Sequence, residues 1–178
     1  MEIPLVMTII GKDRPGLIES VASLVAENSG NWLESRMSRL GGQFAGILRI
    51  TLPSNKEEAL VSALGSLKSR GLNVIIQRDN EDKPTAERPV AELTLVGQDR
   101  PGIVRQISQT LARFGINVEE FETQCSSAPM SGETLFQANA RVQLPADFSS
   151  AELRKELEKI AADLMVEIKW NEIRETNR

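Results

Sequence analysis

The sequence GKDRPGLI at residues 11–18 returns as GQDRPGIV at residues 97–104, 86 positions later (97 minus 11). Each copy follows an apolar run and precedes apolar residues at helical spacing, so each is predicted to connect a strand to a helix. The chain is therefore predicted to be a tandem repeat of one fold, organised around this turn.

The repeated turn offers two kinds of chemistry. A glycine at the start of a helix lets a ligand approach the free backbone N–H groups there, where the positive end of the helix macrodipole favours an anion. The same Asp-Arg-Pro-Gly sequence is also ordinary cap chemistry, in which aspartate accepts from free N–H groups and proline begins the helix. Two copies in the same context favour the binding role. The expected ligand is an anionic group of a small molecule.

Each half of the chain is predicted to contain a strand, a helix, two strands, a second helix and a last strand. In the first half these elements are expected at residues 4–10, 15–28, 32–40, 44–52, 54–67 and 73–77. One face of the first strand is apolar in both halves, which is typical of a sheet with one face on a core. The apolar positions in question are Leu5, Met7 and Ile9 and their counterparts Ala91, Leu93 and Leu95.

Local signals support these assignments. Gly41-Gly42 is typical of a tight turn between two strands, so residues 32–52 are predicted to form a hairpin. Ser54 with Glu57, and Ser149 with Glu152, fit the capping-box pattern at the start of a helix.

The hairpin loop of the second half, residues 126–132, is longer than its counterpart. It could be a lid or a partner contact, although a tolerated surface insertion is favoured.

The element order is the split βαβ pattern of ferredoxin-like folds. The predicted fold class is α+β, with two tandem ferredoxin-like βαββαβ domains, each a four-stranded antiparallel sheet with two helices on one face. The first domain is expected at residues 1–78 and the second at 90–173. Residues 79–89, rich in charge and proline, are the predicted linker, and 174–178 a frayed tail.

Composition excludes several classes of function. The net charge is −4 without a basic patch, so direct binding to nucleic acid is not expected. The chain has no histidine and no tyrosine, which removes the commonest general base, so we expect no catalytic residues and no enzyme. Cys125 is the only cysteine and is expected to be a small, half-buried strand residue rather than a redox group. No metal site and no cofactor is predicted.

The surroundings of the protein can also be predicted. The sequence opens on a strand-like segment without a signal or membrane-spanning pattern, so a cytoplasmic location is expected. Two small domains bury proportionally little surface, so we expect each domain to pack against the other domain or against another copy of the chain in a homo-oligomer.

Each half resembles the ACT domain, a regulatory module that commonly binds amino acids. The resemblance rests on the element order and on the Asp-Arg-Pro-Gly-Leu/Ile turn, and it covers residues 3–173. It implies a small amino acid as ligand, bound at an interface near the first turn of each domain. The positions that it implies are Asp13, Arg14, Gly16 and Leu17, and Asp99, Arg100, Gly102 and Ile103.

Two asparagines are further candidates for ligand contact. Asn31 and Asn117 occupy matching positions at the start of the second predicted strand of each half. Each is either a turn residue or a ligand contact.

A chain made of two such halves is similar to the family of glycine cleavage system transcriptional repressors. The stretch ESRMSRLGGQF at residues 34–44 resembles that family's second strand and hairpin. The resemblance implies a transcriptional repressor that responds to an amino acid, with glycine suspected, and acts by contacting a DNA-binding transcription activator. The alternative is a constitutive assembly module whose turns serve only as caps.

Overall fold

The computed structural model describes residues 1–79, 88–127, 132–146 and 148–173. The chain divides into two compact units, Met1–Lys83 and Pro84–Arg178. Most of the predicted linker (79–89), the centre of the long hairpin loop (126–132) and the predicted tail (174–178) lie outside the described residues, so these assignments remain predictions.

Both units contain the predicted order of elements. The first consists of β1 (Glu2–Lys12), α1 (Leu17–Glu27), β2 (Asn31–Leu40), β3 (Gln43–Pro53), a 3-10 turn (Ser54–Lys56), α2 (Glu57–Ser66), a second 3-10 turn (Leu67–Arg70) and β4 (Leu72–Arg78). The second consists of β5 (Val90–Gln98), α3 (Ile103–Arg113), β6 (Asn117–Ser127), β7 (Thr134–Gln143), α4 (Ser150–Leu164) and β8 (Val166–Ile173).

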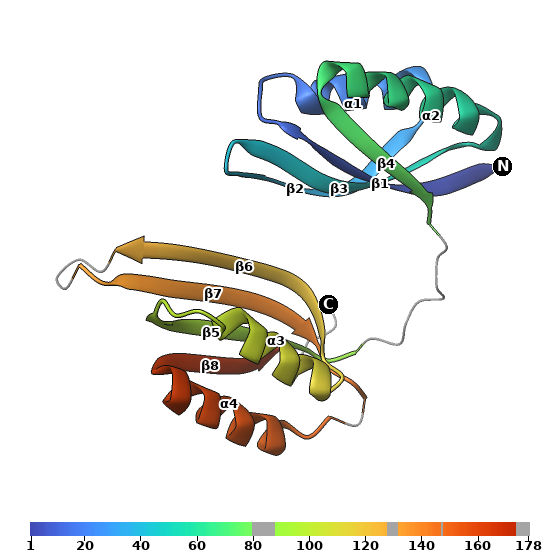
Figure 1. Ribbon diagram of the computed structural model, residues 1–178. Helices are drawn as coiled ribbons and strands as arrows, with labels where there is room; N and C mark the ends of the chain where they lie inside the picture. Colours follow the sequence, from blue (N-terminus) through green and yellow to red (C-terminus); the bar gives the residue numbers. More distant parts are fainter. Residues whose placement is uncertain (80–87, 128–131, 147, 174–178) are drawn as a thin grey trace. The chain divides into compact units, whose positions relative to one another are not determined.

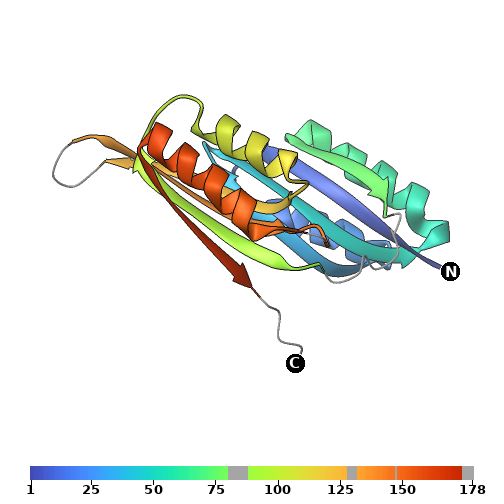
Figure 2. The same cartoon turned by 90° about the horizontal axis from the view of Figure 1, so that it is seen from below.

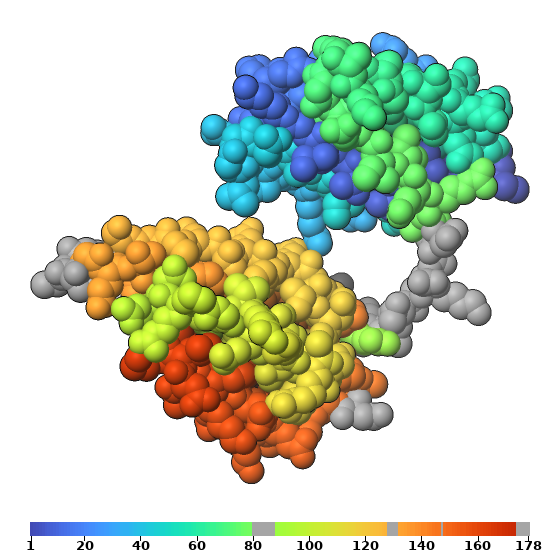
Figure 3. Space-filling view, in the orientation of Figure 1, coloured from blue at the N-terminus to red at the C-terminus, as the bar shows by residue number. Residues whose placement is uncertain are grey.

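Each unit has one four-stranded antiparallel sheet, with strand order β2-β3-β1-β4 in the first and β6-β7-β5-β8 in the second. The two helices of each unit lie on one face of its own sheet (Figures 1 and 2). In the space-filling view the blue residues of β1 and α1 lie directly against green residues of the last helix and strand of that unit (Figure 3). The predicted fold class is confirmed.

The core of each unit lies between the sheet and its helices. Leu5, Met7 and Ile9 on β1 have no exposed surface and pack against apolar residues of α1 and α2. Their counterparts on β5 are equally buried against α3 and α4. The alternation of side chains along the first strand of each unit therefore selects the face that the helices cover.

The hairpin turn of the first unit forms as predicted, whereas the two capping boxes do not. Gly41 and Gly42 both have positive φ, 57° and 77°, which confirms the tight hairpin turn. The capping boxes are wrong: neither Ser54 nor Ser149 makes a side-chain capping bond, and Glu57 instead forms an ion pair with Arg78.

Cys125 is a strand residue as predicted, but the prediction that it is half-buried is wrong, since the thiol is exposed. Cys125 lies on β6, which is the edge strand of its sheet and pairs only with β7. An edge strand has a neighbour on one side only, so a side chain there keeps more of its surface exposed.

Candidate functional site

The repeated motif begins with a glycine because two strands approach closely there. Gly11 and Gly97 lie opposite Leu72 and Val166, the first residues of the last strand of each unit. A Cβ atom on Gly97 would lie 2.4 Å from Val166 Cγ1, and one on Gly11 would lie 2.5 Å from a backbone oxygen. Only glycine allows this approach, so the first position of the motif is structural.

The aspartate of the motif ties the turn to the hairpin through its backbone. Asp13 N–H donates to Gly42 O at 2.9 Å, and Asp99 N–H donates to Thr134 O at 2.8 Å. The turn after the first strand is thereby held to the start of the hairpin's second limb in both units.

The arginine of the motif reaches the loop that precedes the last strand. Arg14 Nη2 donates to Arg70 O at 2.8 Å. Arg100 Nη2 donates to Gln98 Oε1 at 3.2 Å and lies 3.9 Å from Met165 Sδ. Each guanidinium has five N–H donors, so these contacts leave further donors available.

The helix after each turn begins without a side-chain cap. Gly16 and Gly102 are the N-cap residues of α1 and α3, with φ values of 87° and 96° and no side-chain capping bond. This backbone conformation suits glycine. The backbone N–H groups of the first helical turn therefore remain available to an acceptor, which is the requirement for binding an anion.

The predicted capping role of aspartate is not observed in the first unit. The Asp13 carboxylate instead accepts from Arg39, with Nε 2.7 Å from Oδ2. Arg39 lies on β2, opposite Phe44 on β3, so the hairpin carries the arginine to the turn. The motif alone gives no signal for this partner.

A cavity of about 520 Å³ lies at the first turn. It brings together four predicted residues, Asp13, Arg14, Gly16 and Leu17. Ile18, Glu19 and Phe44 complete the lining. A helix N-terminus and a carboxylate–arginine pair beside an aromatic side chain suit a small polar molecule carrying a carboxylate.

The asparagines do not join the turns. Asn31 pairs with Thr51, which in turn pairs with Pro4 near the start of β1, whereas the first turn follows the end of that strand. Asn117 pairs with Gln143, which lies opposite Val90 at the start of β5. Each asparagine is therefore at the opposite end of its sheet from the turn, which favours its turn role.

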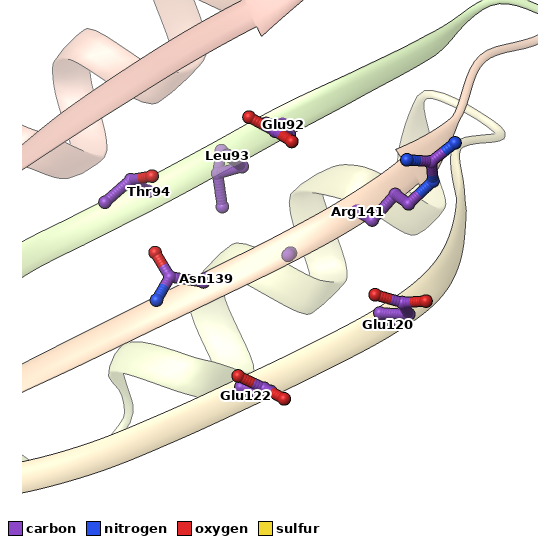
Figure 4. Close-up of a pocket in the computed structure, with 8 residues that line it drawn as sticks. Glu92, Leu93, Thr94, Glu120, Glu122, Asn139 and Arg141 are labelled. Atoms are coloured by element: carbon purple, nitrogen blue, oxygen red, sulfur yellow. The ribbon is translucent and has the colours of Figure 1, made fainter. Parts of the chain in front are cut away.

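A second cavity, of about 320 Å³, lies on the face of the second sheet that the helices leave open (Figure 4). Its polar lining comes from three neighbouring strands and comprises Glu92, Thr94, Glu120, Glu122, Asn139 and Arg141. Arg141 Nε lies 3.3 Å from Glu119 Oε2. Sequence reasoning did not single out this acidic surface.

The open faces of the two sheets differ in polarity. In the first unit Thr8 lies between Ile47 and Ile75, which are 56% and 60% exposed. At the matching place in the second unit Thr94 lies between Asn139 and Lys169. The repeat thus preserves the turn and the core, while the open faces have diverged.

The described residues contain neither a metal-binding cluster nor a membrane-spanning helix. Within residues 1–79, 88–127, 132–146 and 148–173, no cluster of three or more acidic or cysteine side chains has a geometry that could hold a metal ion. Across the same part of the chain, no helix combines the length and the apolar character needed to span a membrane.

Comparison with known proteins identifies relatives over nearly the whole chain. The ACT domain family pattern matches residues 4–77 and 93–171. The chain is 22% identical over 162 residues to the glycine cleavage system transcriptional repressor of Escherichia coli K12, covering 90% of this chain and 85% of that protein. UPF0237 protein MK1213 of Methanopyrus kandleri is 37% identical over 79 residues, which cover 44% of this chain and 81% of that protein.

Two solved structures share the tandem arrangement. An unknown protein from Galdieria sulphuraria has a TM-score of 0.83 and 30% identity, covering 98% of this chain and 100% of its own. A structure described as a putative glycine cleavage system transcriptional repressor has a TM-score of 0.70 and 20% identity, covering 98% of this chain and 99% of its own. At that identity the second likeness speaks for the fold alone.

Proposed function

The chain belongs to the ACT domain family, and we propose that it is a non-enzymatic regulatory protein that binds a small amino acid at its Asp-Arg-Pro-Gly turns. The observation that carries the proposal is the pair of helix N-termini led by Gly16 and Gly102, which no side chain caps. The cavity at the first turn supports it, because the cavity gathers four residues of the motif beside those N–H groups.

The binding chemistry follows from the groups at the turns. A ligand carboxylate would accept from the N–H groups that follow Gly16 or Gly102, helped by the positive end of the helix macrodipole. The ligand ammonium would require an acceptor such as an aspartate carboxylate or a strand carbonyl. Free glycine and other small amino acids carry both groups.

The downstream role that we propose is repression of glycine cleavage genes in the cytoplasm, through contact with a DNA-binding activator. The relative from Escherichia coli that carries this description supports the proposal, as does the absence of a basic patch from the sequence. Regulation would act by linkage: the ligand changes affinity for the protein partner only by its own preference between the two states.

A constitutive assembly module is the second candidate. The contacts of Gly11, Arg14 and the Asp13 N–H favour it, because each has a structural purpose that needs no ligand. Such a module would present its open sheet faces to other copies or to a partner irrespective of amino acids.

Retention of candidate transcription activators on the immobilised chain, with and without glycine, tests the proposal. A regulator would retain one activator in an amount that changes with glycine. Equal retention under both conditions would favour the assembly module, and retention of none would remove the support for repression through protein contact.

A further inference from the structure

Two side chains of opposite charge line the cavity at the first turn. They are Arg14 and Glu19, and both residues are exposed. Arg14 donates to Arg70 O and keeps further N–H donors. Within the described residues no ion pair involves Glu19. The cavity therefore presents both a cation and an anion to a ligand.

Glu19 is the carboxylate of this cavity that remains able to accept from a ligand. Ser23 Oγ, one helical turn further along α1, donates to Glu19 Oε1 at 3.1 Å. A carboxylate has about four lone-pair sites, so this bond leaves most of its capacity. The other carboxylate in the lining, Asp13, is already neutralised by Arg39 at 2.7 Å. An ammonium group in the cavity would therefore gain its charge-assisted hydrogen bond from Glu19.

The same cavity has an apolar wall. Ile18, on α1, is 48% exposed, and Phe44, on β3, is half-buried, and both line the cavity. The volume of about 520 Å³ lies within the roughly 300 to 1,000 Å³ of small-molecule sites, which combine apolar side chains with a few polar groups. Glycine has no side chain and would leave this wall in water, whereas an aliphatic side chain would cover it.

The second turn does not repeat this combination. Arg105 stands 86 positions after Glu19 (105 minus 19), so a cation replaces the acceptor. A cation at that place repels an ammonium group. The apolar character is kept, because Val104 matches Ile18. The pair of opposite charges beside an apolar wall is therefore specific to the first turn.

We infer that the cavity at the first turn takes a zwitterionic amino acid with an aliphatic side chain, such as valine, in preference to glycine. Glu19 accepts from the ammonium, and Arg14 with the N–H groups after Gly16 takes the carboxylate. Ile18 and Phe44 contact the side chain. The inference rests on the proposed function, because it names the class of amino acid for one of the two turns proposed to bind it.

The test is a titration of the full-length chain followed by amide NMR signals, which report each turn separately. The probes are valine, glycine, threonine, which has the shape of valine with a hydroxyl group, and isovalerate, which is valine without the ammonium. We expect valine to shift the amides of residues 16–19 at about tenfold lower concentration than glycine. Threonine and isovalerate should also bind more weakly than valine.

Substitutions separate the two parts of the site. Glu19→Gln should weaken valine by about threefold to tenfold and leave isovalerate unchanged, because only valine carries the ammonium. Its control is Glu27→Gln, at the other end of α1. Ile18→Ser should remove the preference for valine over glycine. Its control is Val61→Ser, a similarly exposed apolar residue on α2 that lies outside the cavity lining. Both controls should bind like the wild-type chain.

The outcomes distinguish this inference from the proposed function. Should glycine or isovalerate bind the first turn as tightly as valine, should valine shift only the amides of residues 102–104, or should Glu19→Gln weaken valine and isovalerate equally, the inference is wrong while the proposed function stands. Should no amino acid shift either turn, both are wrong.

Discussion

Gly97 lies so close to Val166 that a Cβ atom on the glycine would be 2.4 Å from Val166 Cγ1 and 2.8 Å from Val166 Cα. The second distance involves backbone, which cannot move aside as a flexible side chain can. The first glycine of the repeated motif is thus required by the pairing of β5 with β8, whether or not a ligand binds.

We therefore expect Gly97→Ala to destabilise the second unit by about 1 to 3 kcal/mol, the usual cost of overpacking. Urea unfolding measures this change. Gly65→Ala, in the last turn of α2, is the control: a Cβ there meets nothing within 4 Å. Alanine in a helix should raise stability by about 0.5 to 1 kcal/mol. If Gly97→Ala had the same urea midpoint of unfolding as the wild-type chain, the close approach of Gly97 to Val166 would be contradicted.

Met165 offers a stabilising substitution. Its φ is 55°, a left-handed conformation that is unfavourable for a side chain, and the matching residue before β4 is Gly71 with φ 79°. Met165 is also 62% exposed, so little packing is lost when it is shortened. We expect Met165→Gly to raise the free energy of unfolding by about 0.5 to 1 kcal/mol. A decrease would mean that the contact with Arg100 outweighs the backbone strain.

The ion pair between Glu57 and Arg78 predicts a pH dependence. Hydrogen bonds from Arg78 hold the pKa of the Glu57 carboxyl below its ordinary value of 4.5. The folded state therefore binds fewer protons than the unfolded state, so this contribution is present above about pH 4.5 and is lost as the pH falls through the folded pKa.

Melting temperatures of the wild-type chain and Glu57→Gln, followed from neutral to acidic pH, test this dependence. The wild-type chain should be slightly the more stable at neutral pH, and the difference should disappear in acid. Glu58→Gln, on the same helix turn, is the control without an ion pair in the described residues. A difference that persists in acid would show that the ion pair is not its cause.

Much of the fold could be predicted because the sequence contains two copies of it, so that each assignment in one half could be compared with the other half. Leu5, Met7 and Ile9 alternate along β1 as expected, and the same face recurs on β5. The capping box of the first unit failed because the Glu57 carboxylate pairs with Arg78 instead. Local patterns do not register such tertiary competition.

The site was predictable only in part for a similar reason. The motif located the turns, because glycine and proline determine the backbone conformation of the few residues around them. It could not indicate that Arg39 would reach Asp13, because that contact depends on the register of the hairpin. Nor could matching sequence positions show that Asn31 lies at the far end of the sheet from the turn.

We propose that the helix N-termini behind these turns bind a small amino acid. The most direct measurement is the melting temperature of the full chain against the concentration of each proteinogenic amino acid, beside the Gly16→Val, Gly102→Val double variant. A ligand at a hundredfold excess over its Kd adds about 2.7 kcal/mol, on the order of 10 °C for domains of this size. We predict a rise of this kind for at least one small amino acid in the wild-type chain and none in the double variant, and unchanged melting with every amino acid at millimolar concentration would contradict the account.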